Sequence, residues 1–214
     1  MKIYIIRHGE TDANKMAIMQ GVLDWPLNDY GIKLAKITGK NMKDIKFDAC
    51  FSSPLIRAKQ TAEIVLEHSD NNVEIQYDDR IKELNMGTFE GKKARPGELE
   101  VPVIRSTLFR WNPFFCGTFP EGENAFELCA RTKDFLKELS KKEYNNVLVS
   151  THGGATRAML NMFYINKLSF WQEHVPYNCA VNIVEVENGK MELIEKDKIY
   201  YDEKYIVDRY NFKK

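Results

Sequence analysis

Short apolar runs alternate along this chain with longer stretches in which apolar residues recur every three or four positions. Residues 1–6 form the first run, Phe47 to Phe51 the second, Val73 to Tyr77 the third and Val147 to Ser150 the fourth. Apolar runs of this length, bounded by polar or turn-forming residues, are typical of buried β-strands. The pattern therefore predicts four strands separated by helical segments.

Two helices are predicted between the first three strands. Asn28 is suited to cap the first helix, because its side chain can accept from backbone N–H groups of a first turn. Ser53 and Pro54 suit the N-cap and the first helical position of the second helix. The apolar positions are Leu34, Ile37, Thr38 and Met42 in the first helix, and Leu55, Ala58, Ala62 and Val65 in the second.

Two further helices and a hairpin complete the pattern. Asn124 and Glu127 resemble a capping box, Ala155 to Ile165 is helical in character, and Glu187 to Lys190 is a turn between two apolar runs. The helix after Asn124 has the apolar positions Phe126, Cys129, Ala130, Leu136 and Leu139, and the hairpin strands are Val181 to Val186 and Met191 to Glu195. Strands alternating with helices predict an α/β fold, a three-layer sandwich with a mainly parallel central sheet flanked by helices.

Residues 91–122 interrupt this alternation. The segment is rich in basic and aromatic side chains, such as Arg105 and Trp111. An insertion of this length in a compact domain usually forms a lid or a substrate-shaping cap. We therefore expect a single domain over residues 1–214, with 91–122 as a lid or cap insertion. Its basic and aromatic residues form either a packed, solvated cap or a recognition surface, and the tail 200–214 is not assigned.

The composition narrows the class of protein. Of the 214 residues 43% are hydrophobic, and Lys plus Arg and Asp plus Glu both number 31. The hydrophobic share excludes a disordered chain, and the charge balance argues against a nucleic-acid partner. Four cysteines without a C-x-x-C pair indicate free thiols in a reducing compartment. No run is long enough for a signal peptide or a membrane span. We expect a soluble cytoplasmic protein, a monomer or homodimer, without a membrane partner.

Side chains that bind phosphate follow three of the predicted strands. Arg7 and His8 follow the first strand, Arg57 lies in the first turn of the helix after the second, and His152 and Gly153 follow the fourth. In an open α/β sheet, ligands bind beyond the carboxyl ends of the strands, and a helix N-terminus favours an anion. The pattern therefore predicts that one edge of the sheet gathers two histidines and two arginines.

This set of side chains predicts phosphoryl transfer. A neutral imidazole such as His8 can attack phosphorus, and guanidinium groups match the charged oxygens of the transferred group. No metal and no other cofactor is therefore expected. Glu83, after the third strand, is the candidate acid for the leaving oxygen, and Glu90 is the alternative.

Two other interpretations of the histidines stay open. His8, Glu10 and Asp12 alternate in the way that metal ligands do, so a metal site is a rival interpretation of this loop. His68 and His174 have no motif around them, and we expect them at the surface or at an edge.

Several short blocks follow one another in a fixed order along the chain. They are Arg7-His8-Gly9-Glu10-Thr11, Gln20-Gly21, Ser52-Ser53-Pro54-Leu55 with Arg57-Ala58, Glu83 with Gly87, Gly122-Glu123 and His152-Gly153. In order and spacing they resemble the histidine phosphatase superfamily, in the branch of cofactor-dependent phosphoglycerate mutases and related small phosphatases. An ordered match of many blocks, here over about residues 1–185, is far more specific than one short motif.

The resemblance implies a phosphoglycerate mutase-like fold and a phosphoric monoester hydrolase of the histidine acid phosphatase type. By this resemblance His8 is the phosphohistidine nucleophile, and Glu83 is the general acid and later the base that activates water. The other catalytic residues implied are Arg7, Arg57 and His152, and the implied substrate contacts are Asn14, Gln20, Gly21 and Gly153.

Three positions depart from the family pattern. Ile18 stands where the family often has Arg, Leu34 where Gln is usual, and Asn124 where Ser is usual. None of these positions is the nucleophile, but Ile18 removes one cation from the expected rim of the substrate site.

The favoured function is hydrolysis of a small phosphorylated metabolite by a phosphatase. A phosphoglycerate mutase is the alternative, although the Arg-Arg pair and proline run of mutases are not found, and Gly154-Ala155 stands where mutases typically have Asn. A phosphate-binding regulatory module without catalysis is a third hypothesis. It is disfavoured because His8, Glu83 and His152 are all retained.

Overall fold

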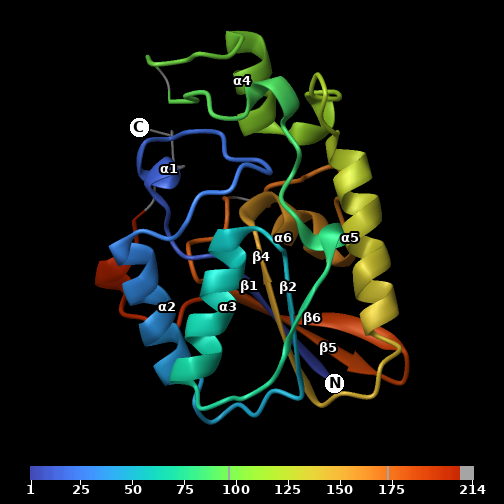
Figure 1. Ribbon diagram of the computed structural model, residues 1–214. Coiled ribbons are helices and arrows are strands. Elements are labelled where there is room, and N and C mark those ends of the chain that lie inside the picture. Colours follow the sequence, from blue (N-terminus) through green and yellow to red (C-terminus); the bar gives the residue numbers. More distant parts are fainter. Residues whose placement is uncertain (96, 173, 208–214) are drawn as a thin grey trace.

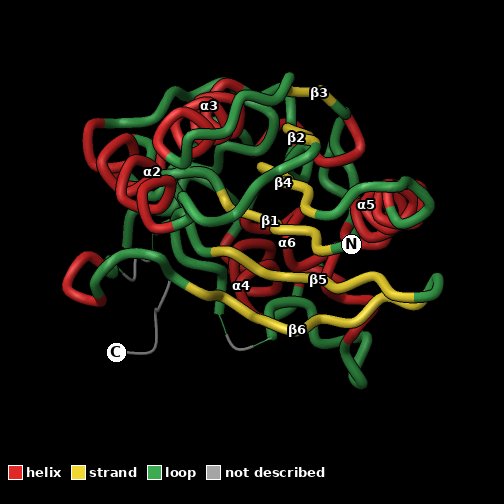
Figure 2. The backbone as a smooth tube through the Cα atoms, turned by 90° about the horizontal axis from the view of Figure 1, so that it is seen from below, coloured by secondary structure: helices red, strands yellow, loops and turns green. Residues whose placement is uncertain are grey.

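A six-stranded sheet with the order β3-β2-β4-β1-β5-β6 forms the centre of the protein. This computed structural model describes residues 1–95, 97–172 and 174–207. The parallel strands are β1 (Lys2–Arg7), β2 (Ala49–Ser52), β3 (Ile75–Tyr77) and β4 (Asn146–Thr151). The antiparallel strands β5 (Val181–Glu187) and β6 (Lys190–Lys198) follow β1 (Figure 2). The mainly parallel sheet of the sequence prediction is therefore confirmed.

Helices cover both faces of the sheet. The helices α2 (Asp29–Asn41) and α3 (Ile56–His68) pack on one face, and α5 (Ala125–Leu139) and α6 (Gly153–Leu160) pack on the other. Successive side chains of a strand point to opposite faces, and β1 shows the consequence. Tyr4 and Ile6 lie in the core under α2 and α3, whereas Ile3 and Ile5 lie in the core under α5 and α6. The fold is a three-layer α/β sandwich, as predicted.

Several local predictions are confirmed. The Asn28 side chain accepts the Gly31 N–H at 2.9 Å and so caps α2. Asn124 and Glu127 form a reciprocal capping box at the start of α5. Asn188 and Gly189, which join β5 to β6, have φ angles of +50° and +76°. Two successive positive φ angles match the twist of a tight hairpin turn, where Asn and Gly are favoured.

The predicted start of α3 is wrong by two residues. The helix begins at Ile56 with Leu55 as its N-cap residue, and the Ile56 N–H donates to Asp24 Oδ1 at 2.6 Å. Ser53 does not cap it, because the N–H that its hydroxyl accepts is that of Leu55, at 3.3 Å, ahead of the first helical residue. The same hydroxyl lies 2.8 Å from His152 Nε2. The predicted apolar positions of α3 are all buried, namely Leu55, Ala58, Ala62 and Val65.

The predicted apolar face of α5 is also partly wrong. Phe126 is 57% exposed and packs against Phe114 of the preceding segment, with ring centroids 4.7 Å apart. Ala130 is exposed as well. The helix turns a different face to the core, formed by Ala125, Leu128, Thr132, Phe135, Leu136 and Leu139. The apolar pattern admitted both faces, and packing against the sheet selects the second.

Residues 91–122 lie above the carboxyl ends of the central strands, where α4 (Val103–Trp111) is at the top of the molecule in Figure 1. The segment also contains the short turn Pro113–Phe115. Val101, Cys116 and Phe119 are buried in an apolar cluster that includes residues of α5 and α6. The segment is thus packed onto the domain rather than detached from it. The short helix α1 (Asp12–Lys15) lies in the loop after β1.

The predicted tail 200–214 is described only to residue 207. Tyr201 is buried, and its hydroxyl donates to the Asn178 carbonyl at 2.6 Å. A 3-10 turn, Glu203–Tyr205, follows. In the part of the chain that the structure describes, no helix is both long and apolar enough to cross a membrane.

Candidate active site

Three neighbouring strand ends bring the predicted residues together. Arg7 ends β1 opposite Thr151 of β4, and Ser52 ends β2 opposite Ser150 of β4. The loop after β1 carries His8, the first turn of α3 carries Arg57, and His152 precedes α6. All four side chains are buried, with 3% exposure for Arg7 and His8, 1% for Arg57 and none for His152. Register therefore places two histidines and two arginines at one edge of the sheet.

The geometry of His8 fixes which ring nitrogen holds the lone pair. His8 Nδ1 lies 2.6 Å from the carbonyl oxygen of Gly9. A carbonyl oxygen can only accept, so Nδ1 carries the proton and Nε2 keeps its lone pair. Burial lowers the pKa of His8 well below its usual value, and the neighbouring Arg57 and Arg7 lower it further. The imidazole is therefore neutral near pH 7, the form that attacks phosphorus.

His152 lies directly beside His8, with ring centroids 5.2 Å apart. Its Nε2 is 2.8 Å from the Ser53 hydroxyl, and its buried Nδ1 has no hydrogen-bond partner in the described structure. Burial, and next the Arg57 guanidinium, lower the pKa of His152 well below its usual value. Like His8, this imidazole is neutral near pH 7.

Arg57 is held by backbone carbonyl groups of the loop after α1. Its Nη1 donates to the Leu23 carbonyl at 2.8 Å and its Nη2 to the Gly21 carbonyl at 2.7 Å. Burial lowers the pKa of Arg57 to about 10, which still leaves it cationic at neutral pH. Gly21 has a φ of +49°, and a Cβ there would lie 1.9 Å from the Glu90 carboxylate. Glycine therefore allows the backbone approach that orients Arg57.

Arg7 and Gly153 lie next to each other at the start of α6. Arg7 Nη1 donates to the Pro176 carbonyl, which ties β1 to the segment before β5. Gly153 is the first residue of α6, and a Cβ at this position would lie 3.0 Å from Val175 and 3.4 Å from Arg7 Nε. The absence of a side chain leaves Arg7 next to the first backbone N–H groups of the helix.

Glu83 places its carboxylate at the N-terminus of α6. Its oxygens accept the N–H groups of Leu84 at 2.9 Å and of Gly154 and Ala155 at 3.0 Å each. Glu83 and His8 both line one cavity. The alternative acid, Glu90, instead joins two loops, because its Oε1 accepts the N–H groups of Val22 and Met86 at 2.9 Å each. This geometry favours Glu83 over Glu90 as the acid.

The two predicted amide contacts lie in the loop around α1. Asn14 Oδ1 accepts the backbone N–H of Thr11 at 3.1 Å, and Gln20 Oε1 accepts the Thr11 hydroxyl at 2.9 Å. Both amide oxygens thus accept hydrogen bonds from Thr11 of the same loop. The amide N–H groups are therefore the donors with which these side chains can contact a phosphate oxygen. Both residues line the cavity with His8.

The cavity has a volume of about 610 Å³, a polar floor and largely apolar walls. Its floor is formed by Arg7, His8, Arg57 and Glu83. The walls come from four regions, which are the loop after β1, the loop 83–89, the segment 91–122 and the chain before β5. Their apolar residues include Ile18, Met19, Met86, Phe89, Val101, Phe109, Phe119, Phe170 and Trp171. Ile18, the position where the family often has Arg, thus adds an apolar group to the wall.

Sequence reasoning missed several residues that face this cavity. Arg105 and Arg110 line it from the segment predicted as a lid or cap. Tyr177 and His174, neither predicted as a site residue, also line it, and the His174 side chain is 35% exposed, in keeping with the expected edge position. His174 Nε2 lies 3.6 Å from the Asp197 carboxylate. No motif surrounds these positions, and only the folded chain brings them to the site.

The rival metal interpretation receives no geometric support. Within the described residues, no three His, Cys, Asp or Glu side chains lie close enough together to hold a metal ion. Glu10 and Asp12 both accept from the Asn28 side-chain amide, at 3.0 Å and 3.4 Å. These carboxylates therefore help to fix the start of α2.

The chain belongs to the histidine phosphatase superfamily (branch 1), whose family profile matches residues 3–197. It is 36% identical over 170 residues to the fructose-2,6-bisphosphatase TIGAR of Xenopus tropicalis. The aligned region covers 74% of this chain but only 60% of that relative. It is 30% identical over 204 residues to the broad-specificity phosphatase YOR283W of Saccharomyces cerevisiae, covering 92% of this chain and 84% of the relative.

A solved structure of the family has the same fold. YhfR of Bacillus stearothermophilus superimposes with a TM-score of 0.84 at 27% identity, over 92% of this chain and 97% of that one. The expected phosphoglycerate mutase-like architecture is therefore confirmed.

Proposed function

We propose that this protein is a phosphatase that hydrolyses a small phosphomonoester through a phosphohistidine on His8. The main support is the geometry of His8, whose Nδ1 is committed to the Gly9 carbonyl, so that the nucleophilic lone pair is on Nε2. Two buried guanidinium groups flank this imidazole, and the Glu83 carboxylate shares its cavity. Nucleophile, fixed positive charge and acid are the three parts that this reaction requires.

In the first step, His8 Nε2 attacks the phosphorus atom. The N–P bond forms as the P–O bond to the leaving group breaks, and Glu83 gives a proton to the departing oxygen. In the second step, Glu83 takes a proton from a water molecule, which attacks the same phosphorus atom. The N–P bond breaks, inorganic phosphate is released, and His8 returns to its neutral form.

The remaining site residues bind the oxygens of the phosphoryl group in this proposal. Arg7 and Arg57 offer fixed cations to the three equatorial oxygens, and the neutral His152 adds a donor. Asn14, Gln20, Gly21 and Gly153 complete the substrate contacts. Because Arg7 and Arg57 are already held by backbone carbonyls, these cations need little rearrangement when substrate binds.

Residues 91–122 are assigned as the cap of the single domain. Nine of the described residues that line the cavity come from this segment, namely Ala94, Val101, Arg105, Ser106, Thr107, Phe109, Arg110, Trp111 and Phe119. The segment thus forms much of the wall around the leaving group and shields the phosphoryl group from water.

The comparisons favour a phosphatase, with a mutase as the second candidate. One relative named above is a broad-specificity phosphatase and one is a fructose-2,6-bisphosphatase, while the family also includes phosphoglycerate mutases. Ile18 in the cavity wall replaces a cation of the usual rim, which weakens the grip on a second acidic group. We assign the chain to the phosphoric monoester hydrolases, of the histidine acid phosphatase type, acting on a small phosphorylated metabolite in the cytoplasm.

Turnover of an aryl phosphate and of 3-phosphoglycerate separates these functions. A phosphatase releases inorganic phosphate from the aryl phosphate, does not interconvert 2- and 3-phosphoglycerate, and does not respond to added 2,3-bisphosphoglycerate. A mutase interconverts 2- and 3-phosphoglycerate and requires 2,3-bisphosphoglycerate to load its histidine. A phosphate-binding module without catalysis releases no phosphate from either compound, and that result would refute the proposal.

A further inference from the structure

The loop that carries Glu83 runs without a partner strand. It follows the 3-10 turn Asp79–Ile81, and residues 82–86 belong to neither a helix nor a strand. Backbone carbonyl groups in such a loop still need donors when they are partly buried. The position of the Glu83 carboxylate at the N-terminus of α6 therefore depends on the groups that bind this stretch of backbone.

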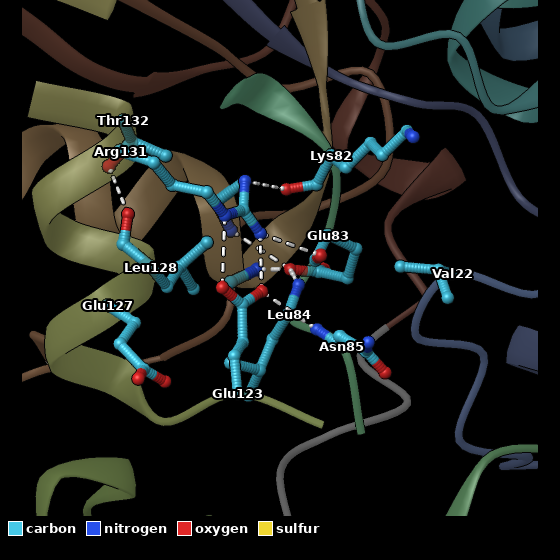
Figure 3. A network of polar contacts seen from close by, with 12 residues as sticks. Val22, Lys82, Glu83, Leu84, Asn85, Glu123, Glu127, Leu128, Arg131 and Thr132 are labelled. Atoms are coloured by element: carbon cyan, nitrogen blue, oxygen red, sulfur yellow. Dashed lines mark hydrogen bonds and ion pairs between the residues drawn. The ribbon is translucent and has the colours of Figure 1, made fainter. Parts of the chain in front are cut away.

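One guanidinium group on α5 donates to the carbonyl groups on either side of the Glu83 side chain. Arg131 Nη1 donates to the Lys82 carbonyl at 2.8 Å and Arg131 Nη2 to the Glu83 carbonyl at 2.9 Å (Figure 3). Arg131 Nη1 also donates to the Arg80 carbonyl at 2.7 Å. Arg131 thus binds three carbonyl groups around the candidate acid, in place of the missing strand. It does not itself line the cavity.

Glu123 holds both Arg131 and the other end of the loop. Arg131 Nε donates to Glu123 Oε2 at 3.0 Å and Nη2 to Oε1 at 2.5 Å (Figure 3). Glu123 Oε1 also accepts the Asn85 N–H at 2.9 Å, and the Glu123 N–H donates to the Asn85 carbonyl at 2.9 Å. The loop is therefore fixed on both sides of Glu83.

The side chain of Glu83 responds directly to this backbone. Its carboxylate accepts the Gly154 and Ala155 N–H groups at 3.0 Å each from the present position of its Cα. A shift of the loop by about 1 Å would break these contacts, and misplacement on this scale can cost about 100-fold in rate. The side chains of Arg131 and Glu123 are 22% and 17% exposed, so water weakens their ion pair little.

We propose that Arg131, held by Glu123, is a positioning residue that aims Glu83 at the leaving oxygen. This inference rests on the proposed function, since it presupposes that Glu83 is the acid. Arginine suits the task because its planar group presents five N–H donors in a fixed fork, whereas a lysine ammonium is a single flexible point charge. Arg131 acts through Glu83 and contacts neither nucleophile nor substrate.

The test measures the rate of His8 phosphorylation in single turnovers with two substrates. An alkyl phosphate needs the proton from Glu83 in the transition state, whereas a nitrophenyl phosphate has a leaving group that departs nearly unaided. Arg131→Met should slow the alkyl phosphate by about 10- to 100-fold, part of the loss expected for an absent general acid, and the nitrophenyl phosphate by less than about threefold. The alkyl phosphate rate of Arg131→Lys should lie between that of Arg131→Met and that of the unmodified protein.

Arg80→Met is the matched control. The Arg80 side chain also ties this loop to α5, through Asp134 and Glu138 at 2.9 Å each, but its ion pairs do not involve the carbonyl groups on either side of Glu83. Its thermal stability should fall about as much as that of Arg131→Met, while the ratio of the two phosphorylation rates stays at the unmodified value. If Arg131 has a merely structural role, the ratio of the two phosphorylation rates in Arg131→Met will also stay at the unmodified value.

The outcomes separate this inference from the proposed function. If Glu83→Gln lowers the alkyl rate selectively but Arg131→Met and Arg131→Lys slow both substrates equally, the inference is overturned and the proposed function stands. If no phosphohistidine forms in the unmodified protein, the proposed function itself has failed. If Arg131→Met does not fold, Arg131→Lys, which keeps the charge opposite Glu123, decides the question by the same ratio.

Discussion

The imidazole rings of His8 and His152 lie with their centroids 5.2 Å apart and their planes tilted by 57°. Both rings are buried beside Arg57, and both have a pKa lowered well below the usual value. The fixed positive charge of the site therefore resides on the arginines near neutral pH, and the two imidazoles are uncharged. This division of charge leaves His8 with the lone pair that the proposed reaction uses.

The pKa of the two histidines can be tested by NMR titration of their ring resonances. Burial and the neighbouring Arg57 both disfavour the imidazolium form, so both rings should remain neutral as the pH falls through 6.5. In Arg57→Met one positive neighbour is lost, and both titrations should move to higher pH. Titration of His8 at or above pH 6.5 in the unmodified protein would refute this electrostatic account.

The same pKa shifts make folding stability depend on pH. A histidine whose folded pKa is lowered binds fewer protons than it does in the unfolded chain, so its contribution is full above about pH 6.5 and is lost as the pH falls. Protonation of His8 in the unfolded chain should reduce the free energy of unfolding by at most about 1.4 kcal/mol between pH 7.5 and 5.5. Because His8→Gln lacks this titrating group, its free energy of unfolding, measured with urea, should fall less over the same pH range than that of the unmodified protein. An identical pH dependence in both proteins would contradict the prediction.

Substitution of Glu83 should separate the two halves of the reaction. Glu83→Gln should slow phosphorylation of His8 by about 10²- to 10⁴-fold with an alkyl phosphate and far less with a nitrophenyl phosphate. Dephosphorylation should slow with every substrate, since the same carboxylate then acts as base. Single-turnover rates measure the first step directly.

Glu90→Gln is the control for this experiment, because a glutamine Oε1 can still accept the Val22 and Met86 N–H groups. It should retain the unmodified ratio of rates for the two substrates. Equal slowing of phosphorylation for both leaving groups in Glu83→Gln would leave Glu83 with a supporting role only.

Chelators should leave the activity intact. Arg7 and Arg57 are already directed into the site and supply the charge that a metal ion provides in other phosphatases. Phosphate release should be the same before and after dialysis against EDTA. Complete loss of activity, restored by a divalent cation, would instead support a metal site at the loop of His8, Glu10 and Asp12.

The sequence predicted the convergence of the site because strand ends are defined by local patterns. The apolar runs before Arg7 and His152 give the strands, and parallel pairing then brings their ends to one edge. Local pattern was misleading at Ser53, because the helix is capped instead by Asp24, which lies 32 positions away along the chain. The hydroxyl of Ser53 instead lies 2.8 Å from Nε2 of His152, the residue that precedes α6.

Contacts between distant segments also explain what the sequence did not reveal. Arg131 binds the carbonyls of Arg80 and Glu83, which are 51 and 48 positions away. Backbone acceptors are common to all residue types, so no sequence motif distinguishes the arginine that will bind them. His174 likewise lines the cavity because the chain before β5 returns to the end of β1, where Arg7 binds the Pro176 carbonyl.

Detection of the phosphoenzyme is the most direct test of the central claim. The protein is mixed with an alkyl phosphate, quenched in alkali within one turnover and digested, and the phosphorylated peptide is identified by mass spectrometry. The account predicts an acid-labile, alkali-stable phosphate on His8, present in His68→Ala and absent in His8→Ala, which should also lose nearly all hydrolysis. Phosphate on another residue, or a His8→Ala variant that retains most of its hydrolytic rate, would contradict it.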